Sequence, residues 1–235
     1  MAFALAVGVG SVLIARHFYA QRLINHVWPQ KGLEGVATPL PQVEGGILLI
    51  GDSRMAEWRL VRLAGLPVTN GAISGSTSAE MSGRLRRQLE SNHPRIVIIE
   101  VGINDLKLIG VRPELKEAII SQCLTQIMQA IDLCCEYNVQ VFLLPVWPGG
   151  PVTPLRRLVW NESINVAVRE LNGRMREEAF SRTHVTLVPV FSEILRQDSS
   201  HQSELYRDTL HMKAETYHLL SEALNTFIGA RLKGK

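Results

Sequence analysis

One serine, one aspartate and one histidine are spaced in a way that supports nucleophilic catalysis. Ser53 follows directly after a short apolar run, and Asp208 lies three residues before His211 near the other end of the chain. A serine hydroxyl is a weak nucleophile at neutral pH and needs an adjacent base. His211 can take its proton and return it to a leaving group, provided that an acceptor orients its second ring nitrogen. Asp208 can supply that acceptor from the same turn.

The elements that must position these side chains alternate along the chain from residue 47 onward. Continuous apolar runs such as Ile96-Val97-Ile98-Ile99 are typical of parallel strands buried on both faces. Strands separated by helices pair in parallel through crossovers. The fold class predicted is therefore α/β, a three-layer α/β/α sandwich around a central, mostly parallel five-stranded sheet. We expect strands at 47–50, 67–70, 96–99, 139–144 and 185–188, and helices at 77–90, 114–137, 158–180 and 214–232.

In a sheet of this kind the active site lies beyond the carboxyl ends of the strands. Small and polar residues follow the first three strands at 51–53, 70–75 and 100–105, and the segment before the last helix carries Asp208 and His211. Together these segments supply a hydroxyl, flexible turns, a carboxamide, a carboxylate and an imidazole. That set of groups is sufficient for acyl transfer.

The N-terminal part of the chain differs from the rest. Residues 2–15 form an uncharged apolar run, which is short for a membrane span of roughly 20 residues. We interpret residues 1–24 as a hydrophobic signal or anchor segment, residues 25–46 as a proline- and glycine-containing linker, and residues 47–235 as the catalytic domain. This organisation predicts a membrane-associated or extracytoplasmic protein. The alternatives are a buried N-terminal helix and a cytoplasmic location.

Composition excludes several other classes of function. The net charge is +3, and basic clusters are short and not interleaved with aromatic residues, so we expect no nucleic-acid partner. The three cysteines fall in one predicted helix, with no CxxC pair and no Cys/His cluster at zinc spacing. We therefore expect neither a metal ion nor an organic cofactor.

Four of these segments resemble, in the same order, the four sequence blocks of the SGNH/GDSL hydrolase family of esterases and lipases, whose fold is flavodoxin-like. The resemblance extends over roughly residues 45 to 230, and residues 206–224 are especially close to the family's last block. The chain has no Gly-x-Ser-x-Gly pentapeptide, which argues against the other large serine-hydrolase architecture. The four blocks are Gly51-Asp52-Ser53, residues 70–75, residues 100–105 and residues 206–211.

The resemblance implies a catalytic triad of Ser53, Asp208 and His211. It also implies an oxyanion hole formed by the backbone N–H groups of Ser53 and Gly75 and by the side-chain amide of Asn104. The function implied is a serine esterase that hydrolyses acyl or acetyl esters of a small molecule, a lipid or a carbohydrate. An O-acyltransferase acting on a carbohydrate or lipid would use the same residues. A non-catalytic binding domain of the same fold is the third alternative.

Two positions depart from the family's usual pattern. Arg54 follows the serine where the family usually has leucine, and Met212 follows the histidine where proline is common. Arg54 could bind an anionic group on the substrate, or it could extend to solvent from the first helical turn. Trp147, in a proline-rich loop after the fourth strand, could line an acyl or sugar pocket, or it could anchor its loop in the core.

Overall fold

The computed structural model of the chain describes residues 2–28, 44–189 and 204–233. Within these residues, six strands form one sheet in the order β2-β3-β1-β4-β5-β6. Five of them are parallel, which confirms the predicted α/β class and the parallel sheet. The strands are β1 (Ile47–Gly51), β2 (Arg62–Leu63), β3 (Leu66–Asn70), β4 (Ile96–Glu100), β5 (Gln140–Leu143) and β6 (Val185–Leu187).

The sixth strand, β2, was not expected from the sequence. It pairs antiparallel with β3 through a two-residue turn, in which Ala64 and Gly65 both have positive φ. Positive φ at both central residues is the geometry that matches the twist of a tight hairpin. Because β2 has two residues, it carries no periodic signal of its own, so the predicted five-stranded sheet is one edge strand too small.

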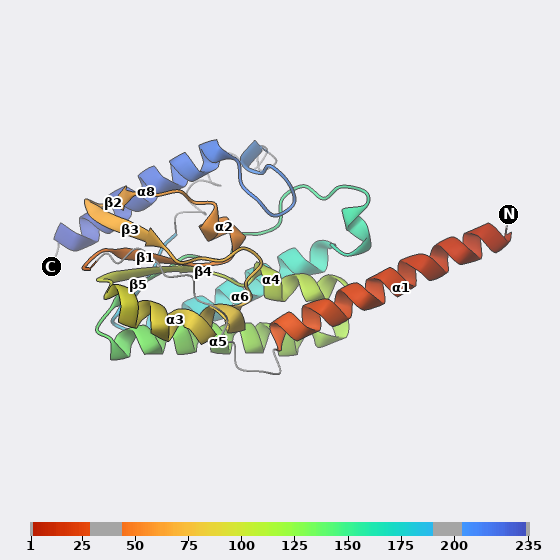
Figure 1. The fold of residues 1–235 in the computed structure, drawn as a ribbon, viewed down its shortest axis with the longest axis horizontal. Helices are drawn as coiled ribbons and strands as arrows, with labels where there is room; N and C mark the ends of the chain where they lie inside the picture. Colours follow the sequence, from red (N-terminus) through yellow and green to blue (C-terminus); the bar gives the residue numbers. More distant parts are fainter. Residues whose placement is uncertain (1, 29–43, 190–203, 234–235) are drawn as a thin grey trace.

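Helices cover both faces of the sheet, which gives the three predicted layers. Apolar side chains on one face of β1 and β4 pack against α3, α5 and α6, and those on the other face pack against α8. Figure 1 shows α8 on one side of the sheet and α3 and α5 on the other. The long helices of the domain are α3 (Ser78–Asn92), α5 (Lys116–Glu136), α6 (Glu162–Phe180) and α8 (Ala214–Lys233).

Short helices begin where strands end, and they carry the polar segments. α2 (Ser53–Ala56) follows β1, and α4 (Ile103–Leu106) follows β4 and continues into the 3-10 helix η1 (Lys107–Gly110). Two further 3-10 helices, η2 (Pro113–Leu115) and η3 (Arg156–Leu158), precede α5 and α6. The helix expected from residue 158 therefore begins at Glu162, because Asn161 caps it by accepting a hydrogen bond from the backbone N–H of Ser163.

The N-terminal helix α1 (Ala2–Val27) has two different halves. Near its end, Leu23 and Val27 are buried against the domain, and the Thr77 hydroxyl donates to the carbonyl of His26 over 2.9 Å. Further back, Leu13 is 61% exposed, and this part of α1 projects away from the sheet in Figure 1. The alternative of a buried N-terminal helix thus holds for the last two turns of α1. It does not hold for residues 11–15 of the apolar run, which are exposed.

Helix α1 also runs through the position at which we placed the start of the linker. It ends at Val27 instead of residue 24, and the partly buried Trp28 packs against the core. Residues 29–43 of the expected linker lie outside the described residues.

One described segment, Pro113–Glu136, is long and apolar enough by composition to cross a membrane. It comprises η2 and α5, and its buried residues belong to the core cluster shared with α3, α6 and the sheet. Packing inside the domain therefore accounts for its apolar face.

The docking of α1 predicts different effects for two leucines in the same helix. Leu23→Ala should lower the free energy of unfolding by about 2 to 4 kcal/mol, because it leaves a cavity under the helix. Leu13→Ala is the matched control and should change it by less than about 0.5 kcal/mol, since Leu13 is 61% exposed. Urea unfolding of the full chain measures both values, and equal effects would show that α1 does not dock on the domain.

Candidate active site

Ser53 owes its position to a close approach between two strands. Gly51 ends β1 beside Glu100 of β4, and a Cβ at Gly51 would lie 1.9 Å from the Glu100 carbonyl oxygen. Glycine is therefore required for β1 to leave the sheet at this point. Asp52 then caps α2 by accepting a hydrogen bond from the backbone N–H of Arg54 over 2.9 Å. Ser53 becomes the first residue of α2 at the carboxyl edge of the sheet.

Asp208 and His211 lie in a tight loop that precedes α8. The loop is closed by a bridge between Tyr206 and Met212 and by a 2.8 Å hydrogen bond from the backbone N–H of Arg207 to the carbonyl of His211. Inside it, Asp208 Oδ1 accepts hydrogen bonds from the backbone N–H of His211, at 2.9 Å, and of Leu210, at 2.7 Å. The carboxylate is thereby fixed before it contacts the imidazole.

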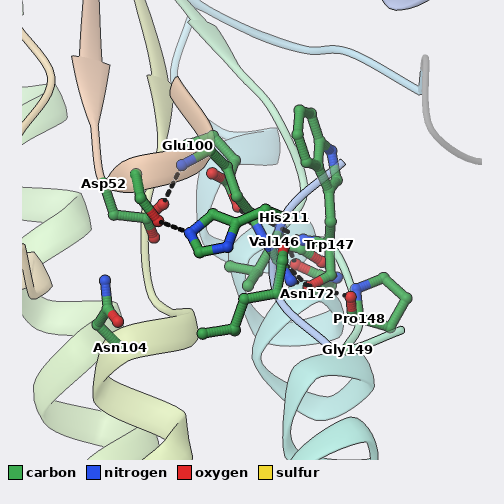
Figure 2. A network of polar contacts seen from close by, with 12 residues as sticks. Asp52, Glu100, Asn104, Val146, Trp147, Pro148, Gly149, Asn172 and His211 are labelled. Carbon is green, nitrogen blue, oxygen red and sulfur yellow. Dashed lines mark hydrogen bonds and ion pairs between the residues drawn. The ribbon is translucent and has the colours of Figure 1, made fainter. Parts of the chain in front are cut away.

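The structure brings the three predicted catalytic side chains together. His211 Nδ1 lies 2.8 Å from Asp208 Oδ2, and His211 Nε2 lies 3.1 Å from Ser53 Oγ. Figure 2 shows the imidazole of His211 with Asp52 on one side and Val146 and Trp147 on the other. Because a carboxylate faces Nδ1, that nitrogen carries the proton, and Nε2 is free to accept from the serine hydroxyl.

The ionisation of Asp208 suits this arrangement. Burial opposes its negative charge, but the hydrogen bonds from the side chain and backbone of His211 and from the backbone of Leu210 outweigh burial and lower the pKa of Asp208 to about 2. The carboxylate is therefore charged at neutral pH and stabilises an imidazolium at His211.

The two other predicted oxyanion residues lie beside one cavity. The amide nitrogen of Asn104 donates to the carbonyl of Ser76 over 2.9 Å, which ties α4 to the loop that carries Gly75. One amide N–H of Asn104 remains available, because this hydrogen bond uses the other. Gly75 has a φ of +83°, a left-handed conformation that favours glycine. Within the described residues, no acceptor bonds the backbone N–H of Gly75 or of Ser53.

The neighbouring acidic residues hold loops in place. Asp105 accepts hydrogen bonds from the backbone N–H of Ser78, at 3.0 Å, and from its hydroxyl, at 2.6 Å, so it anchors the start of α3. Burial raises the pKa of Asp105 to about 7, although the hydrogen bonds from Ser78 oppose the shift.

Among the described residues, no group of three or more His, Cys, Asp or Glu side chains is placed to hold a metal ion.

Arg54 does not contact the substrate side of the site, so our expectation of a substrate contact was wrong, and so was the alternative of a solvent contact. Its side chain is 0% exposed. The guanidinium donates to the carbonyls of Leu210, at 2.8 Å, of Pro148, at 3.0 Å, and of Trp147. It also lies 3.8 Å from the carboxylate of Glu100. Arg54 therefore joins the serine segment, the loop after β5 and the histidine loop from inside the protein.

Trp147 lies in the interior, which agrees with the alternative that it anchors its loop in the core and corrects the alternative that it lines a substrate pocket. Its side chain is fully buried, and its ring packs at a centroid distance of 6.2 Å from that of Trp58. The loop after β5 is thus anchored by the packing of the Trp147 ring and by the hydrogen bonds from Arg54. In the view of Figure 2, Trp147 and Asn104 lie on opposite sides of His211.

Sequence reasoning missed two charged residues beside the site. Glu57 Oε1 lies 3.9 Å from His211 Nε2 and pairs with Arg207 over 3.1 Å. Lys107 donates to the side-chain oxygen of Asn104 over 2.7 Å. Both could have been found from helical spacing, because Glu57 follows Ser53 by four residues and Lys107 follows Asn104 by three.

The interior position of Arg54 predicts a loss of stability when its charge is removed. Arg54→Met should lower the free energy of unfolding by about 3 to 5 kcal/mol, because it removes the buried cation beside Glu100 and leaves the carbonyls of Leu210 and Trp147 without their donor. Arg59→Met, at an exposed position nearby, is the control and should be close to neutral. Urea unfolding measures both. If Arg54→Met kept its stability but lost activity on anionic substrates alone, Arg54 would be a substrate-binding residue after all.

Comparison with known proteins places this site in a family. A family model described as the GDSL-like Lipase/Acylhydrolase family matches residues 49–219. The thioesterase 1/protease 1/lysophospholipase L1 of Escherichia coli (strain K12) is 33% identical over 96 residues, which are 36% of this chain and 46% of that protein. The chain thus spans about half the length of the curated relatives it matches.

Solved structures agree on the fold. A GDSL-like lipase from Bacteroides thetaiotaomicron VPI-5482 has a TM-score of 0.60 at 19% identity, covering 79% of this chain and 88% of its own. An acetylxylan esterase from Geobacillus stearothermophilus has a TM-score of 0.55 at 19% identity, covering 80% of this chain and 95% of its own. The family model covers more than half of the chain and includes Ser53, Gly75, Asn104, Asp208 and His211, so the chain belongs to the GDSL-like lipase/acylhydrolase family.

Proposed function

We propose that this protein is a serine esterase that hydrolyses carboxylic esters with Ser53 as nucleophile. The observation that carries the proposal is the pair of distances at His211: 3.1 Å from Nε2 to Ser53 Oγ and 2.8 Å from Nδ1 to Asp208 Oδ2. Family membership supports the same reaction. The names of its relatives, a thioesterase/lysophospholipase and an acetylxylan esterase, support acyl and acetyl groups as the groups removed.

Acylation begins with attack of Ser53 Oγ on the carbonyl carbon of the ester. The hydroxyl proton passes to His211 Nε2, and Asp208 stabilises the imidazolium through Nδ1. When the tetrahedral intermediate collapses, the bond to the alcohol oxygen breaks, and His211 returns the proton to that oxygen. The products of this half-reaction are the free alcohol and an acyl group on Ser53.

Negative charge on the former carbonyl oxygen needs donors that are already in place. The backbone N–H groups of Ser53 and Gly75 and the second amide N–H of Asn104 are the donors we assign to it. Ser53 also begins α2, and N–H groups at a helix start favour a negative charge. Each donor of this kind is typically worth about 3 to 4 kcal/mol in the transition state.

Deacylation repeats these steps with water. His211 takes a proton from the water molecule as its oxygen attacks the acyl carbon, and it returns the proton to Ser53 Oγ as the acyl bond breaks. The second product is the carboxylic acid, and the enzyme regains its starting protonation state.

We also propose that the N-terminal half of α1 binds a membrane, which would make the protein membrane-associated. The exposed apolar side chains Leu13, Ile14 and Phe18 support this proposal. The uncharged run 2–15 measures about 21 Å as a helix, less than the roughly 30 Å of a bilayer's hydrocarbon core, so it suits insertion better than crossing.

Membrane binding predicts that exposed apolar side chains of α1 contribute to it and that an exposed leucine of the domain does not. The double variant Leu13→Ser/Phe18→Ser should lose most of its co-flotation with phosphatidylcholine vesicles, since burial of these side chains would supply the binding energy. Leu155→Ser, which changes an exposed leucine of the domain, should float like the wild type. Equal flotation of the double variant and the wild type would contradict the proposal.

The esterase proposal predicts the labelling and kinetics of two variants. A fluorophosphonate probe should label the wild type and the exposed-serine control Ser121→Ala, but not Ser53→Ala. His211→Ala should reduce kcat/KM for para-nitrophenyl butyrate by about 10³-fold or more, following other serine hydrolases, and His218→Ala on the exposed face of α8 should not.

Two outcomes would overturn this assignment. Persistent labelling of Ser53→Ala would place the nucleophile elsewhere. A fall of a few-fold in His211→Ala would identify another base, and Glu57 would be the first residue to test because it lies 3.9 Å from His211 Nε2.

A further inference from the structure

A cavity of about 510 Å³ opens beside the residues that we assign to the oxyanion hole. Gly75 and Asn104 form part of its lining, and the opposite wall comes from α1 through Tyr19, Arg22 and His26. Its volume lies within the range of small-molecule sites. Ser53 and His211 are not among its lining residues, so Gly75 and Asn104 connect the cavity to the nucleophile through the oxyanion hole that we propose.

Three basic side chains reach this cavity from three different elements. Arg22 comes from α1, Lys107 from η1 and Arg156 from η3. Within the described residues, none of the three has a carboxylate at ion-pair distance, whereas Arg174, Arg182 and Arg207 elsewhere each do. Cations gathered in one cavity without a carboxylate at ion-pair distance favour the binding of an anion.

The other charged groups of the lining are already engaged with protein atoms. Glu80 accepts hydrogen bonds from the backbone N–H of Thr77 and lies 2.9 Å from His26 Nδ1. Arg84 donates to the carbonyl of Glu80 over 2.9 Å and to the hydroxyl of Ser76 over 3.0 Å. Of the basic residues in the lining, Lys107 also donates to a protein atom, Asn104, whereas the side chains of Arg22 and Arg156 have no hydrogen bond to another residue within the described part of the chain.

Two of the three cations are held in place by their surroundings. Lys107 donates to Asn104, and the guanidinium of Arg156 lies 5.5 Å from the centre of the Trp160 ring. The buried Nε of Arg156 has no hydrogen-bond partner within the described residues. An unsatisfied buried donor is costly, but this Nε is enclosed by the protein and does not itself reach a ligand in the cavity.

The three cations also interact electrostatically. Burial lowers the pKa of Lys107, and Arg156 and Arg22 lower it further, while the buried carboxyl groups Asp52 and Asp105 oppose the shift. An anion among these side chains would relieve their mutual repulsion.

We propose that this cavity is a subsite for an anionic group, a phosphate or a carboxylate, carried by the ester substrate. The proposal rests on the esterase function above and specifies its substrate class. Arg22 and Arg156 bind the anionic group directly. Lys107 contributes positive charge and also orients the side chain of Asn104. Lys107 therefore acts both on the anionic group of the substrate and on the oxyanion hole.

Two matched pairs of esters test the proposal on the full-length wild type. The first compares monobutyrin with its phosphate monoester and places the anion on the alcohol side. The second compares para-nitrophenyl butyrate with para-nitrophenyl hemiglutarate and places a carboxylate on the acyl side. In at least one pair, kcat/KM for the anionic ester should exceed that for the neutral ester by about tenfold or more, as expected for one or two charge-assisted hydrogen bonds.

Variants then assign the preference to the cavity. Arg156→Gln and Arg22→Gln should each reduce the ratio of anionic to neutral kcat/KM by about tenfold. Arg169→Gln, an exposed arginine on α6 that pairs with Glu162, is the matched control and should leave the ratio unchanged. Raising the salt concentration should also reduce the wild-type ratio, because screening weakens the charge interaction.

The outcomes separate the two proposals. Absence of turnover for all four esters would overturn the esterase function itself. Turnover of the neutral esters with a ratio near one in both pairs would overturn the anionic subsite alone. A high ratio that survives in both Arg156→Gln and Arg22→Gln would place the anion elsewhere and would also overturn the subsite.

Discussion

The guanidinium of Arg54 is the interaction on which the geometry of the site depends. Ser53 and His211 come from segments 158 residues apart, and a base must lie within hydrogen-bond distance of its nucleophile. Arg54 follows the serine directly and donates to Leu210 of the histidine loop and to Pro148 of the loop after β5. A planar guanidinium has five N–H donors, so one side chain can satisfy carbonyls from two loops at once.

Burying this charge is costly, and the surrounding groups offset the cost. Glu100 lies 3.8 Å from Arg54. Burial raises the pKa of Glu100, and the nearby Asp52 raises it further, to about 8. The cluster therefore holds one cation, Arg54, beside two carboxyl groups, Glu100 and Asp52, which together balance its positive charge. A leucine after the serine, the family's usual residue, would leave the carbonyls of Leu210 and Pro148 without this donor. The departure at Arg54 is thus matched to the loops of this particular chain.

Apolar runs predicted the parallel sheet, because they mark buried strands, and they placed Ser53 at its carboxyl edge. The resemblance to a known family, and not the strand pattern, implied that Asp208 and His211 would join Ser53 there. Sequence patterns could not predict the burial of Arg54, and they left two positions open for Trp147. A charged residue in a first helical turn is ordinarily at the surface, and its burial depends on carbonyls supplied by distant loops. The docking of α1 on the domain was also not predicted. The apolar run 2–15 is the most prominent feature of the N-terminal sequence, but the buried apolar residues among the described side chains of α1 begin at Ala20.

If both proposals hold, helix α1 joins membrane binding to the shape of the cavity. Its projecting half presents Leu13 and Phe18 to the surroundings, and its docked half supplies Tyr19 and Arg22 to the wall of the cavity. Removal of residues 1–25, a natural choice if the segment were only an anchor, would therefore remove one of the three cations and open the cavity to solvent. Such a truncated protein could retain the triad, because Ser53, Asp208 and His211 all lie in the domain, and still lose its discrimination between substrates. Under the proposed subsite, substrate preference thus depends on α1 as well as on the domain.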